Sequence, residues 1–411
     1  MASTNGHGHG GAPGESSAVV QVQWSSLPDD LLTISYLSLT APIDRVRFAA
    51  VCTAWRAVAS PHLPRSVLPW LILDPSGGHE TDRRAYCPEE SVALPPLSLP
   101  GEALRRCFVG SHDEGWVATS KAPFKAINFF SGAEVALPSK TKFHTSQRRG
   151  DPLVLRKVAF SQRPTLSSCM VAAITNPHEL AFCKVGCPEI GWMIRGLLRS
   201  DHLMDIAFCN GELYGITRDT KMLIKFKFGG LNENLELDVN IYSLCCLNDY
   251  RRGPDERIRY IVELRGNLVM VVSNYRLRNS FTATAENSFT VFELVHDGDR
   301  YSWEKVNSLR DYALFVGPTG SKAMRMPAGG WGDMQENHIY FSHHRCLRRN
   351  DKIPDGVKVF WTSLNDDGYR MYYKKDEIIA DGVKGIVSTG YYAMGGVHPP
   401  MWLFPQRNAE G

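Results

Sequence analysis

Three short segments indicate the fold class of this chain: NGELYGI (210–216), RGNLVMV (265–271) and QENHIYF (335–341). Each places turn-forming residues before an apolar run that also tolerates aromatic side chains. Two of them follow a further apolar run, DIAFC (205–209) and RYIVEL (259–264) respectively. Each segment is therefore expected to belong to a hairpin, in which a strand, a tight turn and a second strand follow one another.

The same pattern of residues continues along the chain beyond Pro64. Short apolar runs alternate with Gly, Pro, Asn and Asp turns, and sustained amphipathic helices are scarce. The sequence therefore predicts a mostly β domain. The runs expected to form strands are 70–73, 115–119, 126–130, 170–174, 181–184, 205–208, 213–217, 223–228, 259–264, 268–273, 289–295, 313–316, 338–342 and 357–362.

The spacing of the hairpin segments favours a β-propeller. They recur at intervals of about 55 to 70 residues, somewhat long for one four-stranded blade, so loop insertions are expected. A pair of β-sandwiches is the alternative, because hairpin repeats alone do not distinguish the two. The aromatic runs WLIL (70–73) and MWLF (401–404) are expected to pair and close the ring, which would remove an open sheet edge.

The segment WSSLPDDLL (24–32) has the features of a helix start. Serines are followed by a proline at a first-turn position and by two acidic residues, and Leu27, Leu31 and Ile34 form one apolar stripe at helical spacing. Two carboxylates near the first turn suit the positive end of the helix dipole. A first helix is therefore expected here.

Two further helices are expected directly afterwards. The second runs from residue 42 to about 52, with Ile43, Val46 and Val51 facing inward. The third runs from residue 53 to about 60, carries Trp55 and Val58, and stops before a proline. Three helices in about 40 residues bury too little surface to fold securely alone. The residues leave two readings open, a surface that a partner covers and a cap packed on the following domain.

The order of motifs in this helical segment resembles the F-box. LPDDLL (27–32), Asp44 with Arg47, and VCTAWR (51–56) follow the family pattern, although Arg45 directly after Asp44 departs from it. The resemblance implies binding to the Skp-type adaptor of a cullin–RING ubiquitin ligase. It assigns Cys52 to packing and not to nucleophilic chemistry. The adaptor-binding positions that carry over are Leu27, Pro28, Leu31, Val51, Cys52 and Trp55.

Blocks in the rest of the chain resemble a large plant F-box family whose C-terminal domain is a kelch-like or KIB-type β-propeller. Two positions depart from the family: Phe129-Phe130 replaces an Asn-Pro, and His338 replaces a cysteine. The blocks cover nearly all of the chain from about residue 68 to 405. They are CFVGSHDEGWVAT (107–119), INFFSGAEVALP (127–138), DYALFVGPTGSKAM (311–324), NHIYFSHH (337–344) and GVHPPMWLFP (396–405).

The expected organisation has four parts. A disordered Gly/Ser-rich tail (1–22) precedes the F-box (23–64), a propeller-like substrate-recognition domain (65–405) and a short tail (406–411). No secretory signal or apolar stretch of about 18 residues is present, so no membrane association is expected. The 10 scattered cysteines are expected to be free thiols in the cytoplasm or nucleus.

Composition and motifs give no support for a nucleic-acid partner, a cofactor or catalysis. The 46 Lys and Arg against 43 Asp and Glu leave a formal charge of +3, too balanced for a nucleic-acid-binding face. Ser111, His112 and Asp113 are adjacent in an expected turn, whereas a catalytic triad converges from separate segments. GPTGSK (317–322) lacks the first glycine of a phosphate-binding loop. No enzyme, cofactor or metal is therefore expected.

The leading interpretation is a non-catalytic receptor that presents a protein target to the ligase. One alternative is an interaction protein that keeps an F-box but acts outside a ligase. Another is an enzyme built on a propeller, which would need a deep central pocket with converging titratable groups. Target contacts are expected on propeller loops, with Phe143, His144, Arg148, Arg149 and Trp331 as candidates.

Overall fold

The chain forms two compact units, residues 1–63 and residues 64–411. The computed structural model describes residues 24, 27–39, 42–59, 69–73, 84–88, 92–93, 106–143, 152–176, 179–197, 202–218, 221–231, 237–246, 257–276, 289–298, 300–326, 334–343, 358–362, 370–376, 379–380, 383–394 and 398–405. Among these residues, no helix has the length and apolar character needed to cross a lipid bilayer.

Three helices make up the described part of the first unit: α1 (Asp29–Ser38), α2 (Pro42–Ala50) and α3 (Thr53–Ala59). The carbonyl of Pro28 accepts hydrogen bonds from the amides of Leu31 and Leu32, both at 3.1 Å, which begins α1. Two aspartates then occupy the first turn, where their charges stabilise the positive end of the helix dipole. The predicted helical segment is therefore present with its expected start.

Phe48 lies at the centre of the small core of this unit. Its ring packs against Tyr36 of α1 at 5.3 Å and Trp55 of α3 at 4.4 Å between centroids. Leu32, Val58 and Ala59 complete the buried cluster. The rings therefore join all three helices.

One inward assignment in the second helix was wrong. Val51 is exposed, because α2 ends at Ala50 and Val51 lies in the bend before α3. Phe48, three residues earlier, takes the buried position instead. The side chains of Ile43 and Val46 lie outside the described set.

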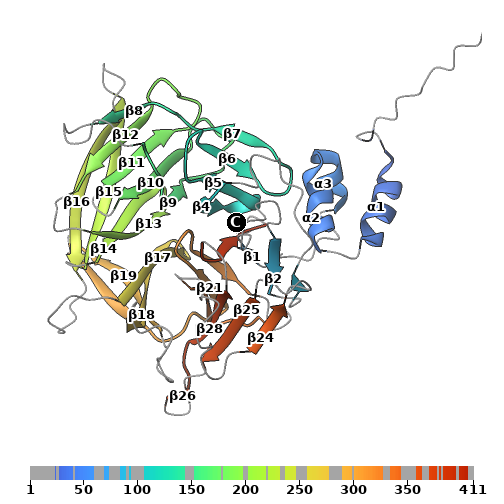
Figure 1. Cartoon of the computed structure of the whole chain (residues 1–411). Helices are drawn as coiled ribbons and strands as arrows, with labels where there is room; N and C mark the ends of the chain where they lie inside the picture. Colours follow the sequence, from blue (N-terminus) through green and yellow to red (C-terminus); the bar gives the residue numbers. More distant parts are fainter. Residues whose placement is uncertain are drawn as a thin grey trace, which may run out of the picture. The chain divides into compact units, whose positions relative to one another are not determined.

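The second unit is built from mainly antiparallel sheets that follow one another around an axis (Figure 1). Its described part contains six sheets of four to six strands. In hydrogen-bonded order they are β29 (Met401–Leu403), β1 (Trp70–Leu73), β2 (Arg84–Cys87) and β3 (Val92–Ala93); β4 (Phe108–His112), β5 (Trp116–Thr119), β6 (Lys125–Asn128) and β7 (Glu134–Ala136); β8 (Thr141–Phe143), β12 (Trp192–Gly196), β11 (Glu179–Lys184), β10 (Met170–Asn176) and β9 (Lys157–Phe160); β13 (Leu203–Cys209), β14 (Glu212–Thr217), β15 (Met222–Leu231) and β16 (Leu237–Cys246); β17 (Arg257–Leu264), β18 (Asn267–Arg276), β19 (Phe289–Asp297) and β20 (Arg300–Val306); and β22 (Lys322–Arg325), β21 (Tyr312–Val316), β23 (His338–Ser342), β28 (Val387–Met394), β25 (Arg370–Asp376) and β24 (Lys358–Thr362). The short strands β26 (Ile379–Ala380) and β27 (Val383–Lys384) pair separately.

The inner strands of these sheets contact one another in turn. β29 contacts β4, which contacts β9; β9 contacts β13, which contacts β17; and β17 contacts β22. Sheets arranged around an axis in this way form a β-propeller. The predicted mostly β fold, a propeller preceded by a small helical segment, is therefore confirmed, and the β-sandwich alternative is excluded.

The two ends of the propeller domain close the ring as expected. β1 pairs with β29 in antiparallel register, with Trp70 opposite Leu403. The indole of Trp402 donates a hydrogen bond of 2.9 Å to the carbonyl of Val316. The first and last strands of the domain therefore share one sheet, in which β29 takes the edge position beside β1 and contacts β4 of the next sheet.

Two of the three expected hairpins are confirmed. Asn210-Gly211 and Arg265-Gly266 join β13 to β14 and β17 to β18, and all four residues have positive φ between 50° and 76°. Two consecutive positive φ angles define the tight turn that suits the twist of a hairpin. Glycine takes the second place of each turn, where it adopts this conformation without steric cost.

The prediction of a third hairpin at 335–341 was wrong. β23 pairs in parallel with β21 on one side and with β28 on the other. β22 already pairs with one edge of β21 in the antiparallel direction, so β23 pairs with the other edge of β21. A parallel neighbour needs a long connection in place of a tight turn.

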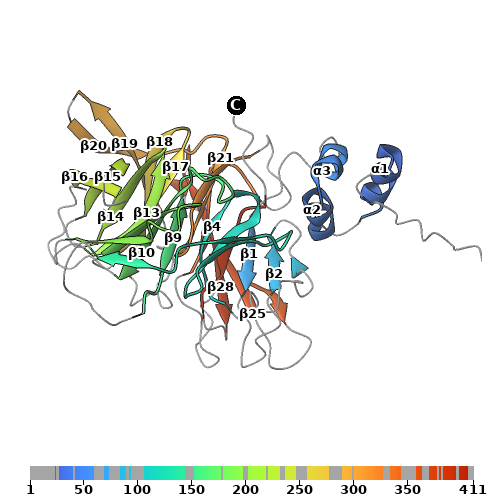
Figure 2. The ribbon, with the colours of Figure 1, turned by 90° about the horizontal axis from the view of Figure 1, so that it is seen from above.

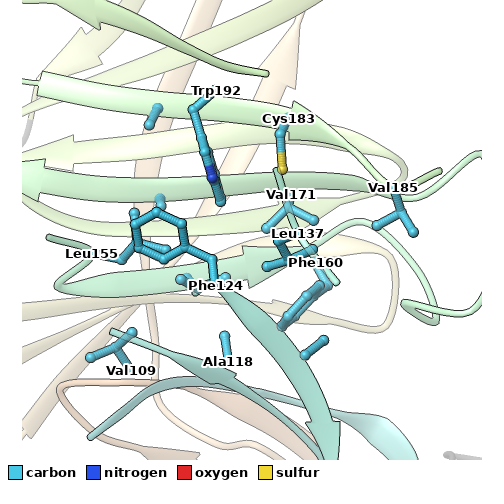
Figure 3. Close-up of a cluster of buried hydrophobic side chains, with 14 of the residues drawn as sticks. Val109, Ala118, Phe124, Leu137, Leu155, Phe160, Val171, Cys183, Val185 and Trp192 are labelled. Atoms are coloured by element: carbon cyan, nitrogen blue, oxygen red, sulfur yellow. The ribbon is translucent and has the colours of Figure 1, made fainter. Parts of the chain in front are cut away.

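Adjacent sheets are joined by buried side chains, as Figure 3 shows for the sheets of β4–β7 and β8–β12. Trp192 lies edge-on to Phe124 at 5.9 Å, and its indole donates a 2.7 Å hydrogen bond to the carbonyl of Pro138. A fully buried tryptophan whose N–H is also satisfied has no polar penalty to offset its hydrophobic gain. Such contacts hold the sheets in a fixed position around the axis.

The hairpin of β19 and β20 extends beyond the rest of its sheet (Figure 2). Residues 289–293 of β19 pair with β18, but residues 294–297 pair only with β20. The ring of His296 stacks on Tyr301 at 4.4 Å near the tip.

Candidate functional site

The first candidate site is an apolar surface on the helical unit. α1 turns Leu32 and Tyr36 into the core, yet it also carries apolar side chains on a second face. Residues three apart on a helix lie near the same face. The exposed fractions are 51% for Leu31, 64% for Ile34 and 59% for Leu37, with Val51 at 57% and Trp24 at 66% elsewhere in the unit.

The six predicted adaptor-binding residues divide into two groups. Pro28, Leu31 and Val51 are exposed. Leu27, Cys52 and Trp55 are partly buried, and the first and last of these pack against the helical core. The assigned positions therefore include both surface side chains and side chains that support the surface.

Trp55 connects the helical core to the segment before α1. Its indole donates a 3.0 Å hydrogen bond to the carbonyl of Trp24. The sequence-based assignment did not include Trp24 or Leu37. Leu37 could have been found by extending the stripe of Leu31 and Ile34 by one further step of three.

The second candidate site is a cavity of about 300 Å³ on the axis of the propeller. Its lining comes from the inner strands β4, β9, β13, β17 and β22, together with Phe404 after β29. Residues from Lys157 to Ser161 line it along the whole of β9, a length of about 13 Å at ~3.3 Å per residue. At one end lie Glu263 and Arg265, both exposed. We call this cavity the axial pocket.

Two ion pairs lie at the axial pocket. The ammonium of Lys322 pairs with the carboxylate of Asp113, which joins β22 to the turn after β4. The ammonium also lies 5.6 Å from the centre of the Phe404 ring. Lys157 pairs with Asp205, and both side chains are buried. The first pair thus joins a turn to a strand of another sheet, and the second joins two strands of different sheets.

The carboxylate of Asp205 contacts two backbone amides in addition to Lys157. It accepts hydrogen bonds from the amide of Ile206 at 2.7 Å and from the amide of Ile261 at 2.9 Å. Burial nevertheless raises the pKa of Asp205, while Lys157 and the two amides act in the opposite direction. The carboxylate therefore joins β9, β13 and β17.

His112 lies in the wall of the axial pocket. Burial is the main cause that lowers its pKa, and Lys322 and Arg163 act in the same direction, whereas Asp113 and Glu114 oppose them. A lowered pKa leaves the imidazole neutral at physiological pH. Its ring then offers one donor and one acceptor.

The adjacent Ser111, His112 and Asp113 do not form a catalytic triad in the described structure. The hydroxyl of Ser111 is buried and has no hydrogen-bond partner among the described residues. Asp113 pairs with Lys322. A nucleophile needs a hydrogen bond to its base, and that contact is absent from this turn. The pocket that a propeller enzyme would need is present, but this grouping is not its catalytic apparatus.

The side chains of the residues expected to contact a target lie outside the described set. His144, Arg148, Arg149 and Trp331 lie outside the described residues. Phe143 ends β8, and only its backbone is described. Within the described ranges, no group of three or more His, Cys, Asp or Glu side chains could hold a metal ion.

Comparison with known proteins identifies the family of this chain. Residues 86–372, more than half of the chain, match the family described as KIB1-4 beta-propeller. The chain belongs to this family. The predicted resemblance to plant F-box proteins with a KIB-type propeller is confirmed by this match and by similarity to relatives that carry the name F-box protein.

Two of those relatives are proteins of Arabidopsis thaliana. At5g55150, whose name describes it as an F-box protein, is 25% identical over 363 residues, which cover 84% of this chain and 92% of the relative. F-box protein SKIP23 is 40% identical over 57 residues, 14% of each chain. The similarity to At5g55150 therefore extends over nearly the full length of that relative, whereas the similarity to SKIP23 covers one short segment of the KIB1-4 propeller chain and of SKIP23.

A solved structure with partial likeness is the N-terminal domain of Nup159. It has 8% identity and a TM-score of 0.33, with 83% of this chain and 73% of that chain covered. A score this low says nothing further about the function of the KIB1-4 propeller.

Proposed function

We propose that this chain is the substrate-recognition subunit of an SCF-type cullin–RING ubiquitin ligase. The F-box, residues 23–64, binds the Skp-type adaptor, and the propeller, residues 65–405, holds a protein target. The relatives named F-box proteins support an adaptor role in general. The chain acts by bringing target and ligase together, because tethering raises effective concentration without a catalytic side chain. Such a role suits the cytoplasm or nucleus.

The observation that carries this proposal is the second apolar face of α1. A short helix that packs on a core needs one apolar stripe. α1 has Leu32 and Tyr36 for that purpose, and its exposed Leu31, Ile34 and Leu37 are left facing solvent. Contiguous exposed apolar side chains mark a surface that another protein covers. This face shares Leu31 with the residues that the F-box resemblance assigns to adaptor binding.

The test is a binding titration of the full chain against a Skp-type adaptor, with alanine variants of Leu31 and Ile34. Each truncation removes apolar contact at the centre of the interface, so affinity should fall about 10- to 100-fold. Leu166→Ala is the matched control, because Leu166 is 47% exposed and lies on the propeller. Equal affinity of all three variants would contradict the assignment of this face.

The alternative is an F-box protein that acts outside a ligase. It shares the fold and the propeller, and it predicts that the folded wild-type chain does not bind the adaptor. The same titration therefore separates the two functions.

A further inference from the structure

Three large apolar side chains are exposed on the described part of the propeller. One is Leu166, between β9 and β10, and the other two, Ile241 and Tyr242, are adjacent on β16. Ile241 is 43% exposed and Tyr242 is 47% exposed. Successive side chains of a strand point to opposite faces of the sheet. Neither face of β16 is therefore fully covered at this point.

The edge of β16 is open over the same residues. β16 is the last strand of its sheet, and β15 is its hydrogen-bonded neighbour among the described strands. In an antiparallel ladder, every second residue directs its N–H and C=O away from the partner strand. Ile241, Tyr242 and Ser243 therefore present backbone donors and acceptors on the outer side of β16. Figure 1 shows this strand at the rim of the propeller.

Buried and partly buried residues bound the open stretch at both ends. Val239 is buried before it. After it, Leu244 and Cys245 are partly buried, and they pack against the same apolar cluster as Trp303 of the neighbouring β20. All four side chains of residues 240–243 are exposed. The open stretch is thus about 13 Å long at ~3.3 Å per residue.

The open stretch lacks the features that keep an edge strand unpaired. Edge strands of native proteins are usually short or carry charged residues or proline. β3 and β7 have two and three residues, and the seven-residue β20 carries Arg300, Glu304 and Lys305. β16 has ten residues, with no charged residue and no proline from Val239 to Cys246. A long, uncharged edge of this kind is a template for a further strand.

We propose that β16 binds an extended segment of the protein target, which adds to the sheet as a fifth strand. Main-chain hydrogen bonds to Ile241, Tyr242 and Ser243 give affinity, and the side chains on the two faces give selectivity. The occupant is an extended chain, because only a strand offers donors and acceptors at the spacing of another strand. This inference rests on the proposed function only in naming the target as the source of the segment.

The side chains of β15 and β16 define the chemistry of the segment. Ile241 lies opposite Phe226 of β15, so this face is apolar. Tyr242 lies opposite Lys225, whose ammonium pairs with Glu212. Cross-strand neighbours on one face contact each other. We therefore expect β-branched or aromatic residues beside Ile241, in alternation with polar or aromatic residues beside Tyr242.

A displayed library of random peptides is the probe. Peptides of about nine residues exceed the length of the open stretch at ~3.3 Å per residue. They are selected on the full chain, resynthesised and titrated by NMR or calorimetry. Saturable 1:1 binding is expected, and the double variant I241K/Y242K should weaken it at least about tenfold, because charges block an edge. Leu166→Lys is the matched control, since Leu166 is also 47% exposed and lies outside β16, and it should bind as the wild type does.

Methylation of the peptide backbone distinguishes strand addition from side-chain contact. A strand directs alternate N–H groups to one neighbour. N-methylation of every second residue should therefore weaken binding at least about tenfold for one alternating set, because hydrogen bonds to β16 are lost. The other set should bind as the unmethylated peptide does. Recognition through side chains alone predicts no such alternation.

Several results would overturn the proposal. They are no selected peptide that binds the folded wild type, equal binding by I241K/Y242K, or equal effects of the two methylated sets. A wild-type dimer in light scattering that becomes a monomer in I241K/Y242K would also overturn it, because a second copy would then occupy the edge. Urea unfolding midpoints equal to that of the wild type verify that the variants are folded.

Adaptor affinity measured on the same samples separates this failure from failure of the proposed function. The substitutions in β16 leave the sequence of the helical unit unchanged, so adaptor binding should stay as in the wild type. Loss of peptide binding with intact adaptor binding is therefore the result that assigns β16 to the target.

Discussion

Trp70 of β1 lies opposite Leu403 of β29, so the first and last strands of the propeller domain are neighbours in one sheet. The next residue back along β29, Trp402, is fully buried and also bonds to the carbonyl of Val316. Its ring lies edge-on to Phe315 at 5.2 Å and to Tyr391 at 5.6 Å. Closure of the ring thus depends on one tryptophan that contacts two sheets.

Trp402→Ala should destabilise the propeller by about 3–5 kcal/mol, because it removes a large buried ring and leaves a cavity. The free energy of unfolding from urea denaturation measures the loss. Trp24→Ala is the control, since Trp24 is mostly exposed, and it should change stability by less than about 0.5 kcal/mol. A loss for W402A no larger than for W24A would show that closure does not need this side chain.

The buried Lys157–Asp205 pair gives a second prediction. Lys157→Met should cost about 3–5 kcal/mol, because it leaves the Asp205 carboxylate buried without its cation. The double variant K157M/D205N removes that unpaired charge and should recover part of the loss. Lys225→Met, which breaks a more exposed pair with Glu212, should cost about 1 kcal/mol or less. Similar losses for both lysine variants would contradict the account.

Gly110 allows β4 and β9 to approach. A Cβ atom at this position would lie 2.4 Å from the carbonyl oxygen of Val158, a backbone atom that a side-chain rotation cannot move away. Gly110→Ala should therefore destabilise the propeller by about 1–3 kcal/mol through overpacking. Gly196→Ala is the matched control, because nothing lies within 4 Å of its Cβ position. Equal unfolding midpoints for the two variants would show that the contact is looser than described.

Burial of His112 predicts a pH effect. Its pKa in the folded state lies below the ordinary 6.5, so between these values the unfolded chain binds more protons than the folded chain. The contribution of His112 to the free energy of unfolding is therefore full above pH 6.5 and falls as the pH drops through that window. Each unit of pKa depression corresponds to about 1.4 kcal/mol.

Urea denaturation at several values from about pH 7.5 to pH 5 checks this effect, with His112→Gln as the comparison. The variant should lose part of the acid sensitivity of the wild type, since glutamine does not titrate. Parallel pH profiles for the two proteins would assign the acid sensitivity to other groups.

Local patterns in the sequence predict much of the fold. Every strand expected from an apolar run is present, because such runs in β1, β21 or β23 bury their side chains completely. The turns at Asn210 and Arg265 follow from the turn residues themselves. β9 was missed, since its four residues begin with a lysine. That lysine is buried only because Asp205, far along the chain, neutralises it.

The functional sites could be predicted only where they are local. The helical unit places its predicted residues within one short segment, and among its described side chains Val51 was assigned to the wrong side. The axial pocket combines Ser111, Lys157 and Lys322 from three different sheets. No spacing in the sequence indicates that these residues meet, because the closure of the ring brings them together.

The most direct test of the central claim is a titration of the purified full chain against a Skp-type adaptor. The account predicts saturable 1:1 binding by the wild type and its loss when Leu31 and Ile34 are both replaced by alanine, while L166A binds as the wild type does. A correctly folded wild-type chain that does not bind the adaptor would contradict the account.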